Sequence, residues 1–269
     1  FLSMGYYFFN NENYAIHAVS LLDTFFINEK TRMNPNLNYV QLIRGPQNTP
    51  KIGRKEGVIS SRTLARIVNI LPLLETFNGY YLLKQDIIHW FNSYLSWLTS
   101  SPLALKAANA KNNIYTWYMV QLTSIEYFLN PVSPRVPNLI LKFFNEALPE
   151  QVDLKTGNQP LESNRAKPLH YLVFNMQAIL YLAELAKDSV GIDVYNTNSL
   201  IHLATHYITS TFIGKAEDQD VTEAVRCVEI LLSRMNGQDD CCQRFVDICY
   251  HCKYSSKIGG PKNAIHSLW

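Results

Sequence analysis

The most informative stretch of this sequence is Glu162-Ser163-Asn164-Arg165-Ala166-Lys167-Pro168-Leu169-His170-Tyr171. It places an arginine and a tyrosine six positions apart, directly before an apolar segment that is predicted to be helical as far as Lys187. A second polar and aromatic stretch lies upstream, Lys111-Asn112-Asn113-Ile114-Tyr115-Thr116-Trp117-Tyr118. It also opens a predicted helix, so both stretches stand where a loop passes into a helix.

Outward from these two stretches, apolar residues recur with a helical period along nearly the whole chain. The pattern predicts about nine helices joined by loops that contain Gly, Pro and Asn, at residues 12–28, 62–77, 85–99, 113–129, 136–148, 171–187, 199–212, 221–235 and 243–254. Long helices in antiparallel succession favour an all-α fold, either an (α/α) toroid or an α-solenoid. No repeat consensus of about 34 or about 40 residues is visible, which disfavours the named repeat families.

Two local features refine this prediction. Pro72 lies inside the predicted helix 62–77 and is expected to kink it or to mark a boundary, and Ser60 or Ser61 is expected to cap its N-terminus. Two loops are long and polar, residues 31–56 and residues 151–168. Long loops of a helical domain often carry function, and the second of them contains most of the stretch quoted first.

Composition limits the class of protein. The 269 residues suffice for one large domain or two small ones, and 47% apolar with 17% charged residues permits a sizeable core and argues against disorder. A formal net charge of +2 implies no strong nucleic-acid field, and no nucleic-acid-binding signature is present. No apolar run is expected to cross a bilayer, so we expect neither nucleic acid nor membrane as a partner.

The first residues, Phe1-Leu2-Ser3-Met4, lack the basic region and the cleavage site of a signal peptide. Because Phe1 is not an initiator residue, we expect that the true N-terminus is missing from this sequence.

All five cysteines fall in the last sixth of the chain, at positions 227, 241, 242, 249 and 252. Cys249 and Cys252 form a single CxxC pair without a second pair at zinc spacing, so no metal site is expected. The alternatives are buried thiols, or one or two disulfides if the protein is exported. The odd number leaves at least one thiol unpaired.

Four segments together resemble the alginate-lyase-type polysaccharide lyases, and they occur in the order found in that family. They are Thr31-Arg32-Met33-Asn34-Pro35-Asn36-Leu37-Asn38-Tyr39-Val40-Gln41, Gly57-Val58-Ile59-Ser60-Ser61-Arg62, the segment from Asn112 to Gln121, and the segment from Arg165 to Asn175. The resemblance covers roughly residues 31 to 187. It fades beyond residue 190, and the cysteine-rich part at residues 226–269 departs from the family.

The resemblance implies a complete or incomplete (α/α) toroid built from antiparallel helical hairpins. We therefore expect residues 1–269 to form one domain that lacks its N-terminal helices. The resemblance also implies an acidic polysaccharide substrate, a secreted, extracellular or periplasmic location, and cleavage by β-elimination without a cofactor.

β-Elimination at a uronate has three chemical requirements. The substrate carboxylate must be neutralised, a base must remove the C5 proton, and an acid must protonate the leaving O4. Arg165 can clasp the carboxylate with two hydrogen bonds, and Asn113 can add an amide donor. Tyr171 can serve as base and then as acid, provided that Arg165 stabilises its phenolate. A solvated loop cation and an ordinary core tyrosine are the alternative interpretations of Arg165 and Tyr171.

Ile114 occupies the position where the family has histidine, in a motif of the form NNHGTWYDVQ. Isoleucine neither donates nor titrates, and two outcomes follow. A syn lyase can still use Tyr171 for both proton transfers on mannuronate or glucuronate, where the C5 proton and O4 leave on the same side. Alternatively, the protein binds the polymer without cleaving it, since loss of one charge-stabilising group costs about 100- to 1000-fold in rate. A third hypothesis is a helical interaction scaffold.

Further residues are expected to line a substrate groove by the same resemblance. Asn36, Asn38 and Gln41 can bond sugar hydroxyls or the carboxylate, although turn formation also explains the asparagines. The remaining candidates are Arg62 as a groove cation or a solvated residue, Trp117 as a wall residue, and His170 in a supporting position. Tyr115 stands where the family has glycine, and its bulk is expected to narrow the substrate subsite.

Overall fold

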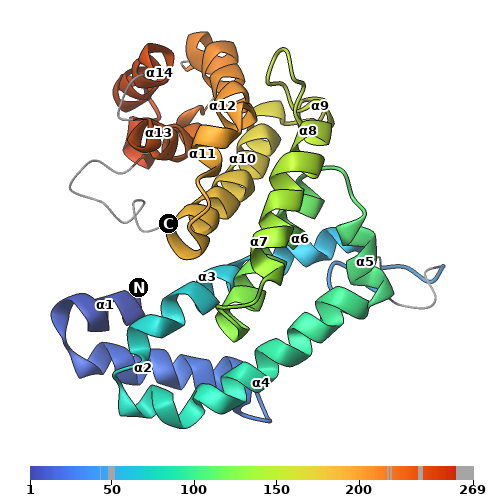
Figure 1. Cartoon of the computed structure of the whole chain (residues 1–269), viewed down its shortest axis with the longest axis vertical. Helices are drawn as coiled ribbons and strands as arrows, with labels where there is room; N and C mark the ends of the chain where they lie inside the picture. Colours follow the sequence, from blue (N-terminus) through green and yellow to red (C-terminus); the bar gives the residue numbers. More distant parts are fainter. Residues whose placement is uncertain (43, 48–51, 217, 219, 236–238, 259–269) are drawn as a thin grey trace. The chain divides into compact units, whose positions relative to one another are not determined.

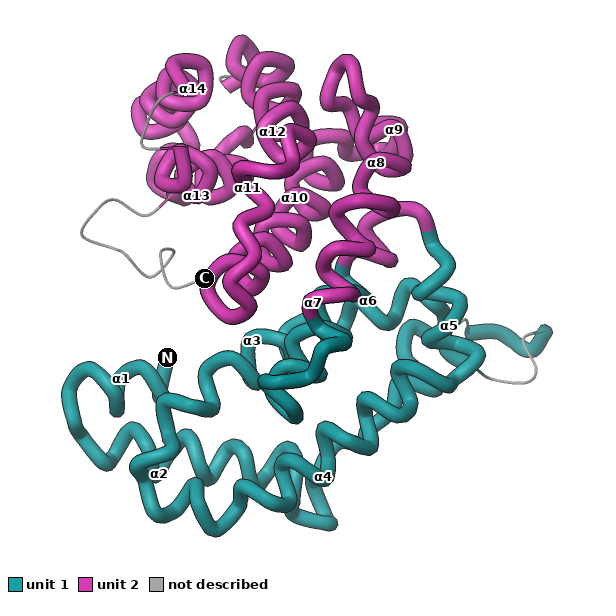
Figure 2. Tube along the Cα trace, in the orientation of Figure 1, with its two compact units in different colours: residues 1–110, 117–136 teal, residues 111–116, 137–269 magenta. Residues whose placement is uncertain are grey.

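The regular elements of the described chain are helices, and they form two compact units. A computed structural model describes residues 1–42, 44–47, 52–216, 218, 220–235 and 239–258. Unit 1 comprises Phe1–Ala110 and Trp117–Val136, and unit 2 comprises Lys111–Thr116 and Pro137–Trp269 (Figures 1 and 2). The expected single domain over residues 1–269 and the divergent part at residues 226–269 stay predictions.

Unit 1 contains the N-terminal helices and most of α6. Its elements are α1 (Leu2–Phe9), α2 (Glu12–Leu22) continued by a π-helical turn (Asp23–Ile27), a 3-10 helix (Lys55–Ser61), α3 (Thr63–Ile70), a 3-10 turn (Leu71–Leu74), α4 (Asn78–Ser100), α5 (Pro102–Ala108) and α6 (Asn113–Leu129). The first four residues of α6 are counted in unit 2 and the other residues in unit 1.

Unit 2 contains the helices that follow. They are α7 (Arg135–Lys142, beginning in unit 1), a π-helical turn (Phe143–Ala147), α8 (Leu148–Gln151), α9 (Pro160–Ser163), α10 (Pro168–Leu185), a π-helical turn (Ala186–Val190), α11 (Val194–Thr197), α12 (Ser199–Phe212), two 3-10 turns (Ile213–Lys215 and Thr222–Ala224), α13 (Val225–Arg234), α14 (Asp240–His251) and a 3-10 turn (Ser255–Lys257).

The predicted helices are confirmed, with differences at their ends. Helices α6 and α12 have the predicted bounds, and the predicted helix 12–28 is α2 with its π-helical turn. Pro72 marks a boundary, because α3 passes there into a 3-10 turn that can accommodate a residue without an N–H. Helix α4 begins seven residues before its predicted start, where Gly79 in the first turn weakens the helical signal. The short helices α1, α5, α9 and α11 were not predicted.

The expected serine cap of the helix at residue 62 is wrong. A 3-10 helix runs directly into α3, and Ser61 is its last residue. The buried Ser61 hydroxyl bonds instead to the Tyr94 hydroxyl at 2.8 Å and to Oε1 of Gln121 at 2.7 Å. Gln121 also donates to the Val58 carbonyl oxygen at 3.0 Å. This buried polar cluster ties the 3-10 helix to α4 and α6 within unit 1.

An aromatic cluster forms part of the core of unit 1. The ring of Phe26 lies 4.8 Å from Trp90 and 5.5 Å from Phe91, measured between centroids, and Trp90 stacks on Tyr94 at 5.6 Å. The indole Nε1 of Trp90 donates to the carbonyl oxygen of Met33 at 2.9 Å. The cluster therefore joins the end of α2 to α4 and anchors the start of the long N-terminal loop.

Helix α10 is the most deeply buried helix of unit 2. It contacts α9, α12 and α13, and its buried residues lie on all sides of the helix, from Leu169 to Leu185. Pro168 occupies the first turn, where its missing N–H is no loss. The buried apolar side chains of α10 pack against its neighbouring helices and hold it in place. Tyr171, in the first turn of α10, is positioned by this packing.

Within the described residues, one helical run, Lys55–Leu74, is long and apolar enough to cross a membrane by length and composition. The expectation that no run would reach this length is therefore wrong. These properties alone do not identify a membrane span, because the core helix of a globular protein has them too. Val58, Leu64 and Leu74 of this run are buried, as in such a core helix.

The five cysteines are free thiols in the structure, and all except Cys241 are buried. Burial raises the pKa of Cys227, Cys242 and Cys249 to about 12. Cys252 donates through its Sγ to the carbonyl oxygen of Cys249 at 3.2 Å. Among the described residues, no group of three His, Cys, Asp or Glu side chains is arranged to hold a metal ion.

Candidate functional site

Arg165 and Tyr171 lie together in unit 2. The guanidinium carbon of Arg165 is 4.1 Å from the centroid of the Tyr171 ring, a cation–π contact. Arg165 is exposed and Tyr171 is half-buried. The turn between α9 and α10 folds the chain back, so the cation lies against the face of the phenol ring. A ligand anion bound by Arg165 would therefore lie beside Tyr171.

Asn113 is joined to Glu162, which begins the stretch quoted first but was not among the predicted site residues. Its backbone N–H donates to Oε1 of Glu162 at 2.7 Å, and its side-chain Nδ2 donates to Oε2 of the same carboxylate at 2.7 Å. Glu162 comes from the short helix α9 and meets Asn113 at the first turn of α6. The positive end of the α6 dipole favours a carboxylate at this place.

Glu162 is buried, with 1% of the residue exposed. Burial raises the pKa of its carboxyl group, while the two hydrogen bonds from Asn113 and the nearby charge of Arg165 oppose that shift. Among the described Asp, Glu, Lys and Arg residues, Glu162 alone is buried to this degree. Asn113 is also buried, with 3% exposed, so only a small part of its amide can reach a ligand.

A cluster of buried amides flanks this pair. Asn175 of α10 donates through Nδ2 to Oε1 of Gln151 at 3.0 Å and to Oε1 of Gln159 at 2.8 Å. The Thr116 hydroxyl, on the next turn of α6 after Asn113, donates to Oε1 of Gln151 at 3.1 Å. The loop that carries Arg165 is thereby bonded to neighbouring helices both at its start and ahead of α9. These hydrogen bonds restrain the loop in addition to its covalent connections to α8 and α10.

The two residues that follow Asn113 are apolar or aromatic. Ile114 is buried, with 6% exposed, and offers no polar atom beyond its backbone. Tyr115 is half-buried, and its ring lies 6.2 Å from that of Phe143, between centroids. Burial, with a smaller contribution from Glu146, raises the pKa of the Tyr115 hydroxyl. The position that Ile114 holds therefore supplies neither charge nor imidazole to a ligand.

His170 contacts Glu223, Phe174 and Tyr171. Its Nδ1 lies 2.9 Å from Oε2 of Glu223, and its ring stacks on Phe174 with centroids 6.1 Å apart. The His170 and Tyr171 rings meet edge to face at 5.3 Å. This arrangement is compatible with the supporting role expected for His170.

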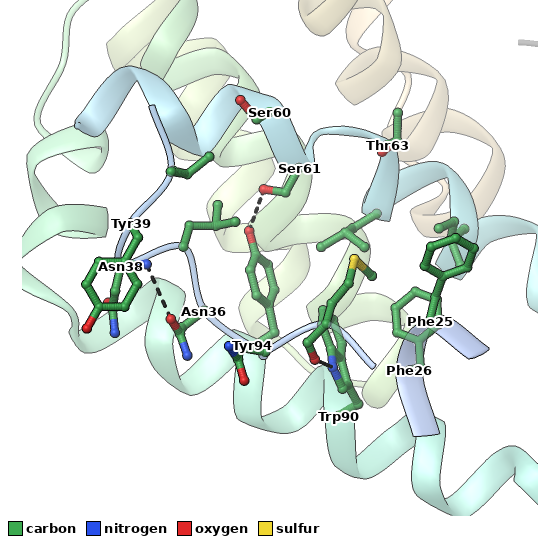
Figure 3. Close-up of a pocket in the computed structure, with 16 residues that line it drawn as sticks. Phe25, Phe26, Asn36, Asn38, Tyr39, Ser60, Ser61, Thr63, Trp90 and Tyr94 are labelled. Atoms are coloured by element: carbon green, nitrogen blue, oxygen red, sulfur yellow. Dashed lines mark hydrogen bonds between the residues drawn. The ribbon is translucent and has the colours of Figure 1, made fainter. Parts of the chain in front are cut away.

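In unit 1 the asparagine-rich loop is held by its own side chains (Figure 3). Oδ1 of Asn36 accepts from the backbone N–H of Asn38 at 3.3 Å, which is the turn chemistry considered as the alternative for the asparagines. Oδ1 of Asn38 accepts from Nε1 of Trp97 at 2.7 Å, and Gln41 donates to the Ser60 hydroxyl at 3.3 Å. A ligand can bind only those polar atoms of the loop that these hydrogen bonds do not already use.

A cavity of about 620 Å³ lies between this loop, α4 and the end of α2. Asn36, Asn38 and Ser60 contribute polar groups to its wall, and Figure 3 shows Trp90, Tyr94 and the two phenylalanines 25 and 26 around it. The lining is mostly apolar, which suits the face of a sugar ring better than its carboxylate.

Trp117 and Arg62 also lie in unit 1, in contact with one another. The guanidinium carbon of Arg62 is 5.8 Å from the centroid of the Trp117 ring. Trp117 is 2% exposed, because it projects into the core from the inner face of α6. It presents no ring face for stacking on a sugar, so its expected place as a wall residue is wrong.

A second cavity of about 620 Å³ lies in unit 2, beside the start of α10. Ser163, Pro168 and Leu172 form one side of it, and Tyr207 and Lys215 lie on the other. It opens next to the turn that carries Arg165.

The structure places Asn113, Arg165, Tyr171 and His170 in unit 2, where the Tyr171 ring contacts both Arg165 and His170, and it places Asn36, Asn38, Gln41 and Arg62 in unit 1. Sequence reasoning missed Glu162 and the amides of Gln151, Gln159 and Asn175. A single glutamate in a polar loop gives no sign that it will be buried. The signal that was available is its place three residues before Arg165.

Comparison with known proteins gives two findings. The sequence profile of the family described as alginate lyase matches residues 1–213. The crystal structure of an alginate lyase from Bacteroides ovatus is similar with a TM-score of 0.81 and 28% identity, over 93% of this chain and 67% of that one. No curated protein matches. The similarity confirms the predicted fold class, an all-α fold of the (α/α) toroid type.

Proposed function

The chain belongs to the alginate lyase family, and from this membership and the geometry of unit 2 we propose that it cleaves a uronate-containing polysaccharide by β-elimination. Mannuronan, alginate and glucuronan are the polymers of this class. The family and the fold support a polysaccharide lyase. We further propose which polymer is cleaved, by which reaction, and by which residues.

Arg165 and Asn113 neutralise the substrate carboxylate in this mechanism, which makes the C5 proton more acidic. The Tyr171 phenolate removes that proton, and the resulting phenol then protonates O4 of the departing sugar. One residue performs both transfers because the C5 proton and O4 lie on the same side of mannuronate and glucuronate. The products are a new reducing end and an unsaturated uronate, and no cofactor takes part.

The observation that carries this proposal is the contact between Arg165 and Tyr171. With the guanidinium 4.1 Å from the ring centroid, a carboxylate clasped by Arg165 comes within reach of the phenol. The buried pair of Asn113 and Glu162 at the start of α6 adds a second fixed donor in the same unit. Substrate binding then needs little reorganisation of these groups.

Ile114 limits the substrate. Guluronate requires a base on the opposite side of the ring from the leaving O4, and Ile114 supplies none at the position where the family has histidine. We therefore propose a syn lyase that leaves guluronan intact.

The same residue supports a second candidate function, a protein that binds polyuronate without cleaving it. Ile114 is buried and apolar, so the charge stabilisation given by the family's histidine is absent from that position. A helical interaction scaffold is the third candidate, and it predicts no affinity for polyuronates.

The test measures release of unsaturated uronate by its ultraviolet absorbance, with mannuronan, glucuronan and guluronan as substrates. The wild type should cleave one of the first two, and Tyr171→Phe should lose at least about 100-fold in rate. Tyr81→Phe, which alters an exposed tyrosine of α4, is the matched control and should keep full activity.

Ile114→His separates the candidates. Activity that appears only in this variant would show a binding protein whose groove survives. If neither the wild type nor Ile114→His cleaves a polymer but both bind mannuronan tightly, the binding function would also be favoured. Absence of both cleavage and binding would favour the scaffold, and cleavage of guluronan by the wild type would refute the syn mechanism.

The expected partner is an acidic polysaccharide, which such an enzyme would meet outside the cytoplasm. A secreted or periplasmic location is part of the proposal, and it rests on the family resemblance.

A further inference from the structure

Burying an ionised carboxylate costs free energy on folding unless hydrogen bonds or an opposite charge compensate it. Among the described residues, Glu162 stands out because it is an acidic residue that is almost fully buried. Its two oxygens are both engaged by one residue, through the backbone N–H and the Nδ2 of Asn113, each at 2.7 Å. Within the described part of the chain, the charge that acts on this carboxyl group is that of Arg165.

The pair of donors explains why a carboxylate occupies this place. Two N–H groups of Asn113 converge on Glu162, and a carboxylate offers an acceptor to each. A glutamine of the same shape would offer one acceptor, while its amide nitrogen would face a second donor. The negative charge is therefore what lets both bonds form at once.

These bonds also decide which way the Asn113 amide is turned. With Nδ2 toward Glu162, one N–H of the amide is used, and the second N–H is the group that can serve a ligand. Without an ionised acceptor, the amide can flip and present its oxygen instead, which would repel a substrate carboxylate.

The carboxylate of Glu162 acts on Arg165 through its charge, and the backbone of residue 162 contacts Arg165 as well. The backbone N–H of Arg165 donates to the carbonyl oxygen of Glu162 at 3.1 Å, so the turn that carries the guanidinium begins at Glu162. The buried amides of Gln159 and Asn175 hold the loop on the other side. One residue thus connects the two groups expected to neutralise the substrate.

We propose that Glu162 is a positioning residue that presets Asn113 and Arg165 to receive the substrate carboxylate. It does not touch the substrate; it fixes the orientation of the Asn113 amide and the start of the Arg165 turn before the polymer binds. This inference rests on the proposed function. Preorganised donors act mainly on the transition state, so Glu162 should affect kcat more than KM.

The carboxylate also carries an energetic cost. Folding raises the pKa of Glu162, mainly through burial, so the ionised group is less favourable in the folded protein than in the unfolded chain.

The experiment compares Glu162→Gln with the double variant Asn113→Asp/Glu162→Gln. In the double variant the donor and acceptor of the side-chain bond are exchanged, and the amide oxygen introduced at position 162 can still accept from the backbone N–H of residue 113. Glu162→Gln should lower kcat about 10- to 100-fold with KM changed less than about threefold. The double variant should recover the thermal midpoint of unfolding but not the activity, because residue 113 would then carry a negative charge.

Glu150→Gln is the matched control, since Glu150 is an exposed glutamate of α8 paired with Lys111. It should keep both activity and stability. Glu162→Asp is made in parallel, so that the inference is tested even if Glu162→Gln does not fold. It keeps the charge at a shorter reach and should lose kcat with little change in KM.

The outcomes separate this inference from the proposed function. An active wild type with an equally active Glu162→Gln would overturn the positioning role alone, and a double variant that regains activity together with stability would show a purely structural role. A wild type that binds mannuronan without cleaving it would overturn the positioning role together with the lyase activity, because the role is inferred to act on the transition state. A wild type that neither binds nor cleaves would overturn both.

Discussion

Arg165 and Tyr171 are six positions apart in the sequence, yet the guanidinium of one lies on the ring of the other. This happens because the chain turns between α9 and α10 and Tyr171 follows in the first turn of α10. Asn113 and Glu162 are 49 positions apart and are joined by two hydrogen bonds. The proposed chemistry therefore depends on one local contact and one distant contact, and the distant one involves the buried carboxyl group of Glu162.

The raised pKa of Glu162 predicts how stability depends on pH. The native protein holds this proton more tightly than the unfolded chain, so the stabilisation is fully present below the ordinary glutamate pKa of about 4.5. It is lost as the pH rises through the raised pKa of the folded state. The free energy of unfolding of the wild type, relative to Glu162→Gln, should therefore fall as the pH rises from about 4 to about 8.

Urea unfolding of both proteins at matched pH values measures this difference. The subtraction removes the effect of Asp153, Asp193 and Asp220, whose pKa values hydrogen bonds or ion pairs lower. A difference that stays constant, or that grows with pH, would contradict the prediction.

The helices hold the candidate site residues in place by anchoring the loops on which these residues lie. In unit 1, α4 holds the asparagine-rich loop by two indole bonds, from Trp90 to Met33 and from Trp97 to Asn38. In unit 2, α6 and α10 hold the loop of Arg165 through buried amides. Both long loops that the sequence marked as functional are thus fixed by polar bonds to a neighbouring helix.

Trp90→Phe tests the anchoring of the first loop. The variant keeps a smaller aromatic ring in the cluster, but the bond to the Met33 carbonyl is lost, and this loss should cost about 1 to 2 kcal/mol. Amide hydrogen exchange should accelerate in residues 31–42 and stay unchanged in α10. Trp97→Phe, which removes the bond to the side chain of Asn38, should accelerate exchange over a shorter part of the loop. Equal exchange in wild type and Trp90→Phe would show that other contacts hold the loop.

The whole chain carries little net charge for a protein proposed to bind a polyanion. A formal charge of +2 gives no broad electrostatic field, so recognition has to come from a few cations in contact with the polymer. Arg165 in unit 2 and Arg62 in unit 1 are the candidates that sequence and structure share.

This low charge predicts a weak dependence on salt. Raising sodium chloride from about 50 to about 500 mM should raise KM for mannuronan by about three- to tenfold and leave kcat within about twofold. The reason is that only one or two counterions are released per bound site. A rise in KM of about a thousandfold, measured in the same assay, would reveal a large basic surface and contradict the prediction.

Helical periodicity was sufficient to predict the helices that are long and amphipathic. Helices α6 and α12 have the predicted bounds, because their apolar positions repeat over several turns and their starts follow asparagines. Short helices such as α9 and α11 carry too few turns for a period, and they form because neighbouring residues hold them. Ser61 looked like a cap in the sequence, but its hydroxyl is bonded to Tyr94 and Gln121, which the chain brings close only on folding.

Local order along the chain was enough for the all-α class and for the pairing of Arg165 with Tyr171, because each depends on residue type and on near spacing. Burial is different, since it depends on what packs around a side chain after folding. It turned Trp117 from an expected wall residue into core, and it made Glu162 the partner of Asn113. Contacts between residues far apart in sequence place these two side chains, and no short stretch of residues reveals such contacts.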